Sequence, residues 1–109
     1  MENEISKQKQ QLLNQAQIYQ QQLQGILAQK ESLNLQLMEI NKALENLEQT
    51  KEKTIYKISG PILIKSDKEE VKKDLNERKE MITLRIKTLE KGEKRLKEKF
   101  EELRAKISK

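Results

Sequence analysis

Residues 55–65 read Ile-Tyr-Lys-Ile-Ser-Gly-Pro-Ile-Leu-Ile-Lys, and this stretch decides how the chain folds. Two short runs rich in isoleucine, Ile55–Ile58 and Ile62–Lys65, lie on either side of Ser59, Gly60 and Pro61. β-Branched runs that flank a turn containing Gly are typical of a β-hairpin. Pro61 has no amide hydrogen to donate, so we expect it in the turn or at the first position of the second strand.

The segment before the hairpin, from about residue 3 to residue 50, carries apolar residues at alternating spacings of four and three. This is the heptad repeat of a coiled coil, whose a and d positions form an apolar seam that needs a partner helix. Lys30 is the one polar interruption. The seam positions are Leu12, Ala16, Tyr19, Leu23, Ile26, Lys30, Leu33, Leu37, Ile40, Leu44 and Leu47.

The segment after the hairpin, residues 67–108, has the same period. Overlapping capping signals mark its start, because Ser66 precedes Glu69 by three residues and Asp67 precedes Glu70 by three. Its seam positions are Leu75, Lys79, Ile82, Ile86, Leu89, Glu93, Leu96, Phe100, Leu103 and Ile107. The sequence therefore predicts a mainly α fold, in which two long antiparallel helices form a coiled coil with a single β-hairpin between them.

The hairpin turn also predicts the pairing of the two helices, with position a of one facing position d of the other. A register shifted by one heptad is the alternative. Two expected pairs, Ile26 with Glu93 and Ile40 with Lys79, require the long polar side chains to extend outward. The other pairs are apolar: Leu12 with Ile107, Tyr19 with Phe100, Leu33 with Ile86, and Leu37 with Ile82.

The hairpin is expected to need a packing partner. An isolated two-stranded hairpin is marginal in water, and its two edges invite further strands. We expect hairpins of several chains to pair into a shared sheet or barrel; packing of the hairpin onto its own helix ends is the alternative. The residues expected in this assembly are Ile55, Tyr56, Ile58, Gly60, Ile62, Leu63 and Ile64.

Four apolar residues lie outside the seam at one level of the helix pair: Leu35 and Met38 in the first helix, and Met81 and Leu84 in the second. We expect them in a contact between subunits. The alternative is the scattered apolar surface that proteins normally carry.

Composition excludes several classes of function. The chain has no Cys and no His, and its three glycines are far apart, so we expect no catalytic residue, no metal site and no cofactor. The net charge of +5 arises after residue 64, but acids and bases alternate there, which favours a solvated helix face over nucleic-acid binding. No apolar run is long enough to span a membrane, and we expect a cytoplasmic protein.

The chain resembles a prefoldin subunit of the beta class, and is similar to the archaeal members, over nearly its full length. The resemblance is carried by Leu23–Leu47, by the Tyr-Lys-x-x-Gly core and aliphatic strand of residues 55–65, and by Asn76–Lys79 and Arg85–Glu90. The single hairpin distinguishes it from alpha subunits, which have two. Gly92 departs from the family, where Gln is expected.

The resemblance implies a hexamer of two alpha and four beta subunits, whose hairpins form a double β-barrel body from which coiled coils extend. It also implies an ATP-independent chaperone that holds unfolded proteins at the coiled-coil tips and passes them to a group II chaperonin. A structural coiled-coil spacer is the alternative, but a spacer has no use for the apolar hairpin.

We expect the tips to be formed by about residues 5–19 and 97–107, where fraying of the helix termini would expose seam residues. Several weak apolar contacts on separate arms would give avidity for unfolded clients. The alternative is that these residues only complete the seam. The expected client-binding residues are Ile5, Leu12, Leu13, Ile18, Tyr19, Phe100, Leu103 and Ile107.

Overall fold

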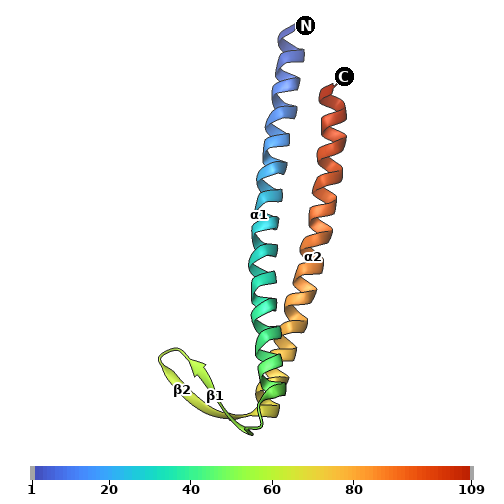
Figure 1. Ribbon diagram of the computed structural model, residues 1–109. Coiled ribbons are helices and arrows are strands. Elements are labelled where there is room, and N and C mark those ends of the chain that lie inside the picture. Colours follow the sequence, from blue (N-terminus) through green and yellow to red (C-terminus); the bar gives the residue numbers. More distant parts are fainter. Residues whose placement is uncertain (1, 109) are drawn as a thin grey trace. The chain divides into compact units, whose positions relative to one another are not determined.

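The computed structural model describes residues 2–108, with the side chains of Glu4 and of residues 6–108. Helix α1 spans Glu2–Gln49, strand β1 Thr54–Ser59, strand β2 Ile62–Asp67 and helix α2 Lys68–Ser108 (Figure 1). The two strands form one antiparallel sheet. The predicted mainly helical fold, with a single hairpin between two long helices, is confirmed. Within residues 2–108, neither helix carries an apolar stretch long enough to cross a membrane.

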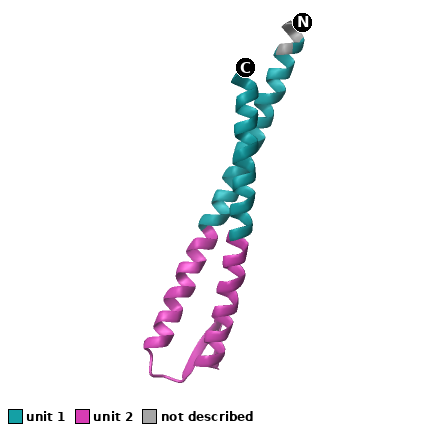
Figure 2. Ribbon diagram, turned by 90° about the vertical axis from the view of Figure 1, so that its right-hand side faces the viewer, with its two compact units in different colours: residues 1–31, 87–109 teal, residues 32–86 magenta. Residues whose placement is uncertain are grey.

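The chain divides into two compact units (Figure 2). Unit 1 consists of residues 1–31 and 87–109, and therefore holds the terminal parts of α1 and α2. Unit 2 consists of residues 32–86 and holds the hairpin with the parts of both helices next to it. Each unit contains its own stretch of the helix–helix seam.

The seam of unit 2 is apolar at its centre. Ile40, Ile82 and Ile86 are buried, and the partly buried residues that pack against them are Leu33, Leu37, Leu44 and Leu75. All seven occupy predicted seam positions. The predicted partners Leu33 with Ile86 and Leu37 with Ile82 lie in this one cluster, as the expected register requires. Burial of these side chains, not intrinsic helix propensity, supplies most of the stability of such helices.

The seam of unit 1 contains an ion pair. Lys30 Nζ lies 2.8 Å from Glu93 Oε2, and Ile26 lies beside Gly92, where an added β-carbon would stand 3.5 Å from Ile26 Cδ1. The position of Ile26 beside Gly92 agrees with the expected pairing of Ile26 with Glu93. The expectation that Glu93 extends outward is wrong, because its side chain is only 13% exposed and contacts Lys30, whose side chain is long enough to reach across one helical turn. The two polar residues of the seam thus satisfy each other.

The hairpin closes with a two-residue loop. Ser59 pairs with Ile62, so Gly60 and Pro61 alone connect the strands. Gly60 has a φ of 59°, which fits the first central position of a type II′ turn, where Gly is preferred. Pro61 therefore lies in the turn, where no ladder hydrogen bond is asked of it.

Asp67 ends β2 and also caps α2. The backbone N–H of Glu70 donates to Asp67 Oδ1 at 2.9 Å, so of the two capping signals the one at Asp67 is used. The helix begins at the next residue, Lys68. No connecting residue separates the strand from the helix.

Candidate interaction surfaces

One face of the hairpin is apolar and exposed. Directly opposite residues of paired strands share a face, so Tyr56, Ile58 and Leu63 lie together. All three are more than 60% exposed, and Ile58 reaches 77%. Apolar side chains at the centre of a face normally pack against something, so this face is a candidate contact surface.

The other face of the hairpin is covered only near the helices. Ile55 is half-buried in a depression that Leu47, Val71 and Leu75 also line. Lys57 Nζ lies 3.5 Å from Asp74 Oδ2 of α2. Further along the same face Ile62 and Ile64 are exposed. Packing of the hairpin on its own helix ends therefore accounts for Ile55 but leaves most of the apolar hairpin uncovered.

Hydrogen bonds join the segments that enter and leave the hairpin. The Lys68 backbone N–H donates to the Lys53 carbonyl at 3.0 Å, and Lys68 Nζ donates to the Thr50 carbonyl at 3.1 Å. Lys72 Nζ donates to Glu48 Oε1 at 3.1 Å, and this hydrogen bond raises the pKa of Lys72. The base is anchored, while the exposed apolar residues lie towards the turn.

Unit 2 exposes the four predicted off-seam residues as well. Leu35, Met38, Met81 and Leu84 are between 56% and 70% exposed. They are the exposed large apolar residues among the described helical residues of this unit. The side of the helix pair that each residue faces follows from its position relative to the seam residues of its helix.

In unit 1 the predicted client-binding residues differ in their exposure. Leu13 and Ile18 are exposed, whereas Leu103 is buried at 6% exposure and becomes accessible only if the helices separate. The side chain of Ile5 lies outside the described residues. The half-buried members of the set are Leu12, Tyr19, Phe100 and Ile107.

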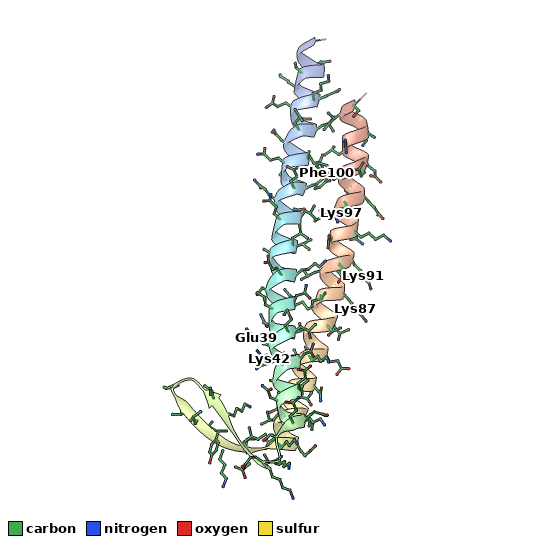
Figure 3. The ribbon with its side chains drawn as sticks, viewed as in Figure 1. Glu39, Lys42, Lys87, Lys91, Lys97 and Phe100 are labelled. Atoms are coloured by element: carbon green, nitrogen blue, oxygen red, sulfur yellow. The ribbon has the colours of Figure 1, made fainter. Side chains whose placement is uncertain are left out.

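Tyr19 and Phe100 line a shallow apolar groove in unit 1. Leu23, Leu96 and Lys97 line it as well, and Figure 3 labels Lys97 and Phe100 on α2. The Tyr19 hydroxyl accepts a hydrogen bond from Gln15 Nε2 at 3.0 Å. The groove is a mainly apolar surface with polar edges, which suits an apolar side chain of a bound peptide.

Two features of unit 1 were not predicted from the sequence. Leu27 is 44% exposed, next to the seam residue Ile26. Glu93 accepts hydrogen bonds from Lys30 and from Lys97 Nζ at 3.0 Å. Both hydrogen bonds lower the pKa of Glu93, and the one from Lys30 has the larger effect. The hydrogen bond to Glu93 in turn raises the pKa of Lys30. Both polar seam residues were visible in the sequence, and pairing them required allowing for the length of lysine.

The described surface carries open depressions lined by charged residues. Within the described residues, no three acidic or other metal-binding side chains gather closely enough to hold a metal ion. The depressions lined by Lys and Glu, such as that around Lys94 and Glu98, are open to solvent.

Comparisons with known proteins give a consistent result. A family model described as prefoldin subunit matches residues 10–109. The prefoldin subunit beta of Thermococcus onnurineus is 44% identical over 104 residues, covering 94% of this chain and 90% of the relative. The prefoldin subunit beta of Archaeoglobus fulgidus is 41% identical over 105 residues, covering 95% and 90%.

Solved structures agree with the sequence comparisons. The crystal structure of the prefoldin beta subunit from Thermococcus strain KS-1 superposes with a TM-score of 0.85 at 39% identity, covering 92% of this chain and 89% of that one. The prefoldin beta2 subunit of the same strain gives a TM-score of 0.74 at 24% identity, which shows the shared fold.

Proposed function

This chain belongs to the prefoldin subunit family, and we propose that it is a cytoplasmic beta-type subunit that assembles through its hairpin and holds unfolded proteins at its tips without ATP. The family is a non-enzymatic chaperone family whose members assemble with other prefoldin subunits. The observation that carries the proposal is the exposed apolar hairpin of unit 2, with Ile58 77% exposed.

The hairpin is proposed as the assembly element because a sheet with two free edges and two apolar faces is completed by more strands. The partners are hairpins of an alpha-type subunit and of other copies of this chain, in a hexamer of two alpha and four beta subunits. Burial of one exposed Ile or Leu side chain contributes about 1.5–3 kcal/mol. Several such side chains on each chain, less the cost of association, are sufficient for a stable body.

Native mass measurement tests the assembly. The chain is measured with and without an alpha-type subunit, and the mixture is expected to give a hexamer. Ile58→Glu and Leu63→Glu should abolish it, because a buried carboxylate has no partner in an apolar barrel. Lys65→Glu is the matched control, since Lys65 lies on the same face but is already charged. A hexamer that survives both apolar replacements would contradict the proposal.

The client-binding proposal rests on the apolar content of unit 1 beyond the seam. Leu13 and Ile18 are exposed, and the groove of Tyr19 and Phe100 lies within the same unit. Weak contacts of this kind, repeated on several arms, give affinity without a shaped pocket. An apolar surface without a shaped pocket accepts many sequences, as promiscuous binding requires.

Suppression of aggregation of a denatured protein, measured without nucleotide, tests this activity. Leu13→Ser with Ile18→Ser should weaken suppression several-fold while the hexamer mass is unchanged. Asn14→Ser with Gln17→Ser is the control, because these two residues are also exposed but are polar. Full suppression by the apolar-to-serine variant would remove Leu13 and Ile18 from the client surface.

Delivery to a group II chaperonin is proposed through the basic residues of α2 in unit 1. Lys94, Arg95 and Lys97 are exposed there, and further bases follow at Lys99, Arg104 and Lys106. Positive charge would steer docking onto an acidic surface and make the contact sensitive to salt. Binding to a chaperonin that is unchanged between about 50 and 500 mM salt would contradict this mode of docking.

A further inference from the structure

The off-seam apolar residues of unit 2 form two patches that face opposite ways. Leu35 lies two residues from both Leu33 and Leu37, so it points roughly 200° around α1 from the seam. Leu84 lies two residues from both Ile82 and Ile86, and points away from the seam on α2 in the same manner. Met38 and Met81 are their neighbours on those outer sides. We name these pairs the α1 patch (Leu35, Met38) and the α2 patch (Met81, Leu84).

The two patches stand at the same distance along the helices from the hairpin. In the register that packs Leu37 with Ile82, Leu35 is level with Leu84 and Met38 is level with Met81. Arms that share one hairpin body point the same way at one height. The α1 patch of one subunit is then level with the α2 patch of the subunit beside it. This step rests on the proposed assembly through the hairpin.

One pair of opposite charges stands at the same level across such a contact, because Lys42 is level with Glu77 and both are exposed. Two further opposite pairs are offset along the helix axis, Glu45 with Lys73 by one residue and Glu39 with Arg78 by two residues, or about 3 Å. The exposed Glu80 and Asp74 stand level with Glu39 and Glu45, so the match is carried by Lys42 and Glu77. Figure 3 shows Glu39 and Lys42 extending from α1 away from α2, so they are available to a neighbour.

The same charges disfavour the symmetric alternative. If the α1 patches of two copies met about a two-fold axis, Lys42 would face Lys42 and Glu39 would face Glu39. Like charges across a contact are unfavourable, and a symmetric contact between α2 patches would oppose Glu77 to Glu77. The Lys42–Glu77 pair therefore favours a head-to-tail contact in which unlike patches meet.

We propose that neighbouring copies of this chain pack side by side, with the α1 patch of one on the α2 patch of the next. Each copy has both patches, on opposite sides of its helix pair. The contact is a second interface beside the hairpin, and it sets the spacing of adjacent arms where they leave the body. Its apolar centre with a complementary charged rim is the usual composition of a specific protein interface.

Disulfide cross-linking in the assembled complex tests the contact directly. The chain has no cysteine, so Met38→Cys in one tagged copy and Met81→Cys in a second, differently tagged copy form a disulfide only if unlike patches meet. The expected product is the mixed dimer. Complexes containing Met38→Cys alone, or Met81→Cys alone, are the controls and should not cross-link.

The outcomes separate this inference from the proposed function. If native mass shows no assembly, the hairpin hub fails. Three results overturn the paired-patch contact while the hub stands. The assembly forms without a mixed dimer, it gives only same-position dimers, or the Met38→Cys copy cross-links only to a companion subunit of another type when that subunit carries the second cysteine.

Charge reversal gives a second readout with an internal rescue. Lys42→Glu places like charges at the contact and should slow mixed cross-linking about two- to fivefold. Glu77→Lys in the same chain restores the opposite pair, and cross-linking should recover. Reversal of Lys94, which is exposed in unit 1, is the control and should have no effect. Failure of the double variant to recover would overturn the charge matching.

Discussion

The seams of the two units share the heptad pattern but differ in the side chains that fill it. In unit 2 the centre of the seam is occupied by Ile40, Ile82 and Ile86, all buried. In unit 1 the seam is interrupted by the Lys30–Glu93 ion pair, and each helix carries a glycine, Gly25 and Gly92. Unit 2 has a polar seam position as well, the half-buried Lys79, but it holds four of the five buried apolar side chains among the described residues. Unit 1 keeps the heptad period and holds the fifth, Leu103.

Removal of a buried isoleucine should break this comparison most strongly. Ile82→Ala leaves a cavity at the centre of the unit 2 seam and should lower the free energy of unfolding by about 2–5 kcal/mol. Leu89→Ala, at a half-buried seam position of unit 1, should cost less. Urea denaturation followed by circular dichroism measures both. An equal or greater loss for Leu89→Ala would contradict the difference in packing.

Replacing the two helical glycines of unit 1 with alanine should stabilise its helices. Gly25→Ala and Gly92→Ala should each stabilise the chain by about 0.5–1 kcal/mol, because Ala loses less conformational freedom in a helix. There is room for both methyl groups, and the one at position 92 would contact Ile26 Cδ1. Thermal unfolding measures the change.

Gly60 provides the opposite control. Its φ of 59° lies in the left-handed region, so Gly60→Ala should destabilise the hairpin even though nothing lies within 4 Å of the added carbon. If all three glycine replacements changed the melting temperature in the same direction, the conformational argument would be wrong.

Exchange of the ion pair for leucine tests whether unit 1 trades stability for a specific register. Lys30→Leu with Glu93→Leu should raise the melting temperature, since an apolar pair often packs better than a partly buried ion pair. Glu93→Leu alone should lower it, because Lys30 then has no carboxylate partner. The double variant should also shift more readily by a heptad, which cysteine cross-linking between α1 and α2 measures.

The pH dependence of the melting temperature should show the smallest of these effects, because it reports only the Lys30–Glu93 pair of unit 1. The pKa of Glu93 is lowered from its usual 4.5, so its contribution is complete above that value and is lost as pH falls through the lower pKa of the folded state. The pKa of Lys30 is raised from 10.5, so its contribution is present below that value and lost as pH rises through the higher one. Melting temperatures measured from acid to neutral pH should fall less steeply at the acid end for Glu93→Gln than for the unchanged chain.

The seam could be predicted from the sequence because period alone determines it. Every predicted seam position from Leu12 to Ile107 is buried or half-buried. The partner of Glu93 could not be predicted in the same way, because a heptad register assigns positions and not the reach of a side chain. The choice between the caps at Ser66 and Asp67 likewise depended on where β2 ends, which only the strand pairing decides.

The candidate surfaces were predicted in composition but not in exposure. Leu103 and Leu13 are the same residue type in the same unit, yet one is buried and the other exposed, because only Leu103 occupies the seam. Ile55 and Ile58 differ for a similar reason, since strand alternation and distance from the helices decide which is covered. Neither difference follows from residue type.

The direct passage from β2 into α2 at Asp67 has a mechanical consequence. Residues 50–53 connect α1 to β1, whereas no residue lies between β2 and α2. The Lys68–Lys53 hydrogen bond joins these two connections. A pull or twist exerted on the start of α2 would thus be transmitted straight into the sheet. One residue inserted after Asp67 would rotate the helix by about 100° relative to the sheet and would turn its seam residues away from α1.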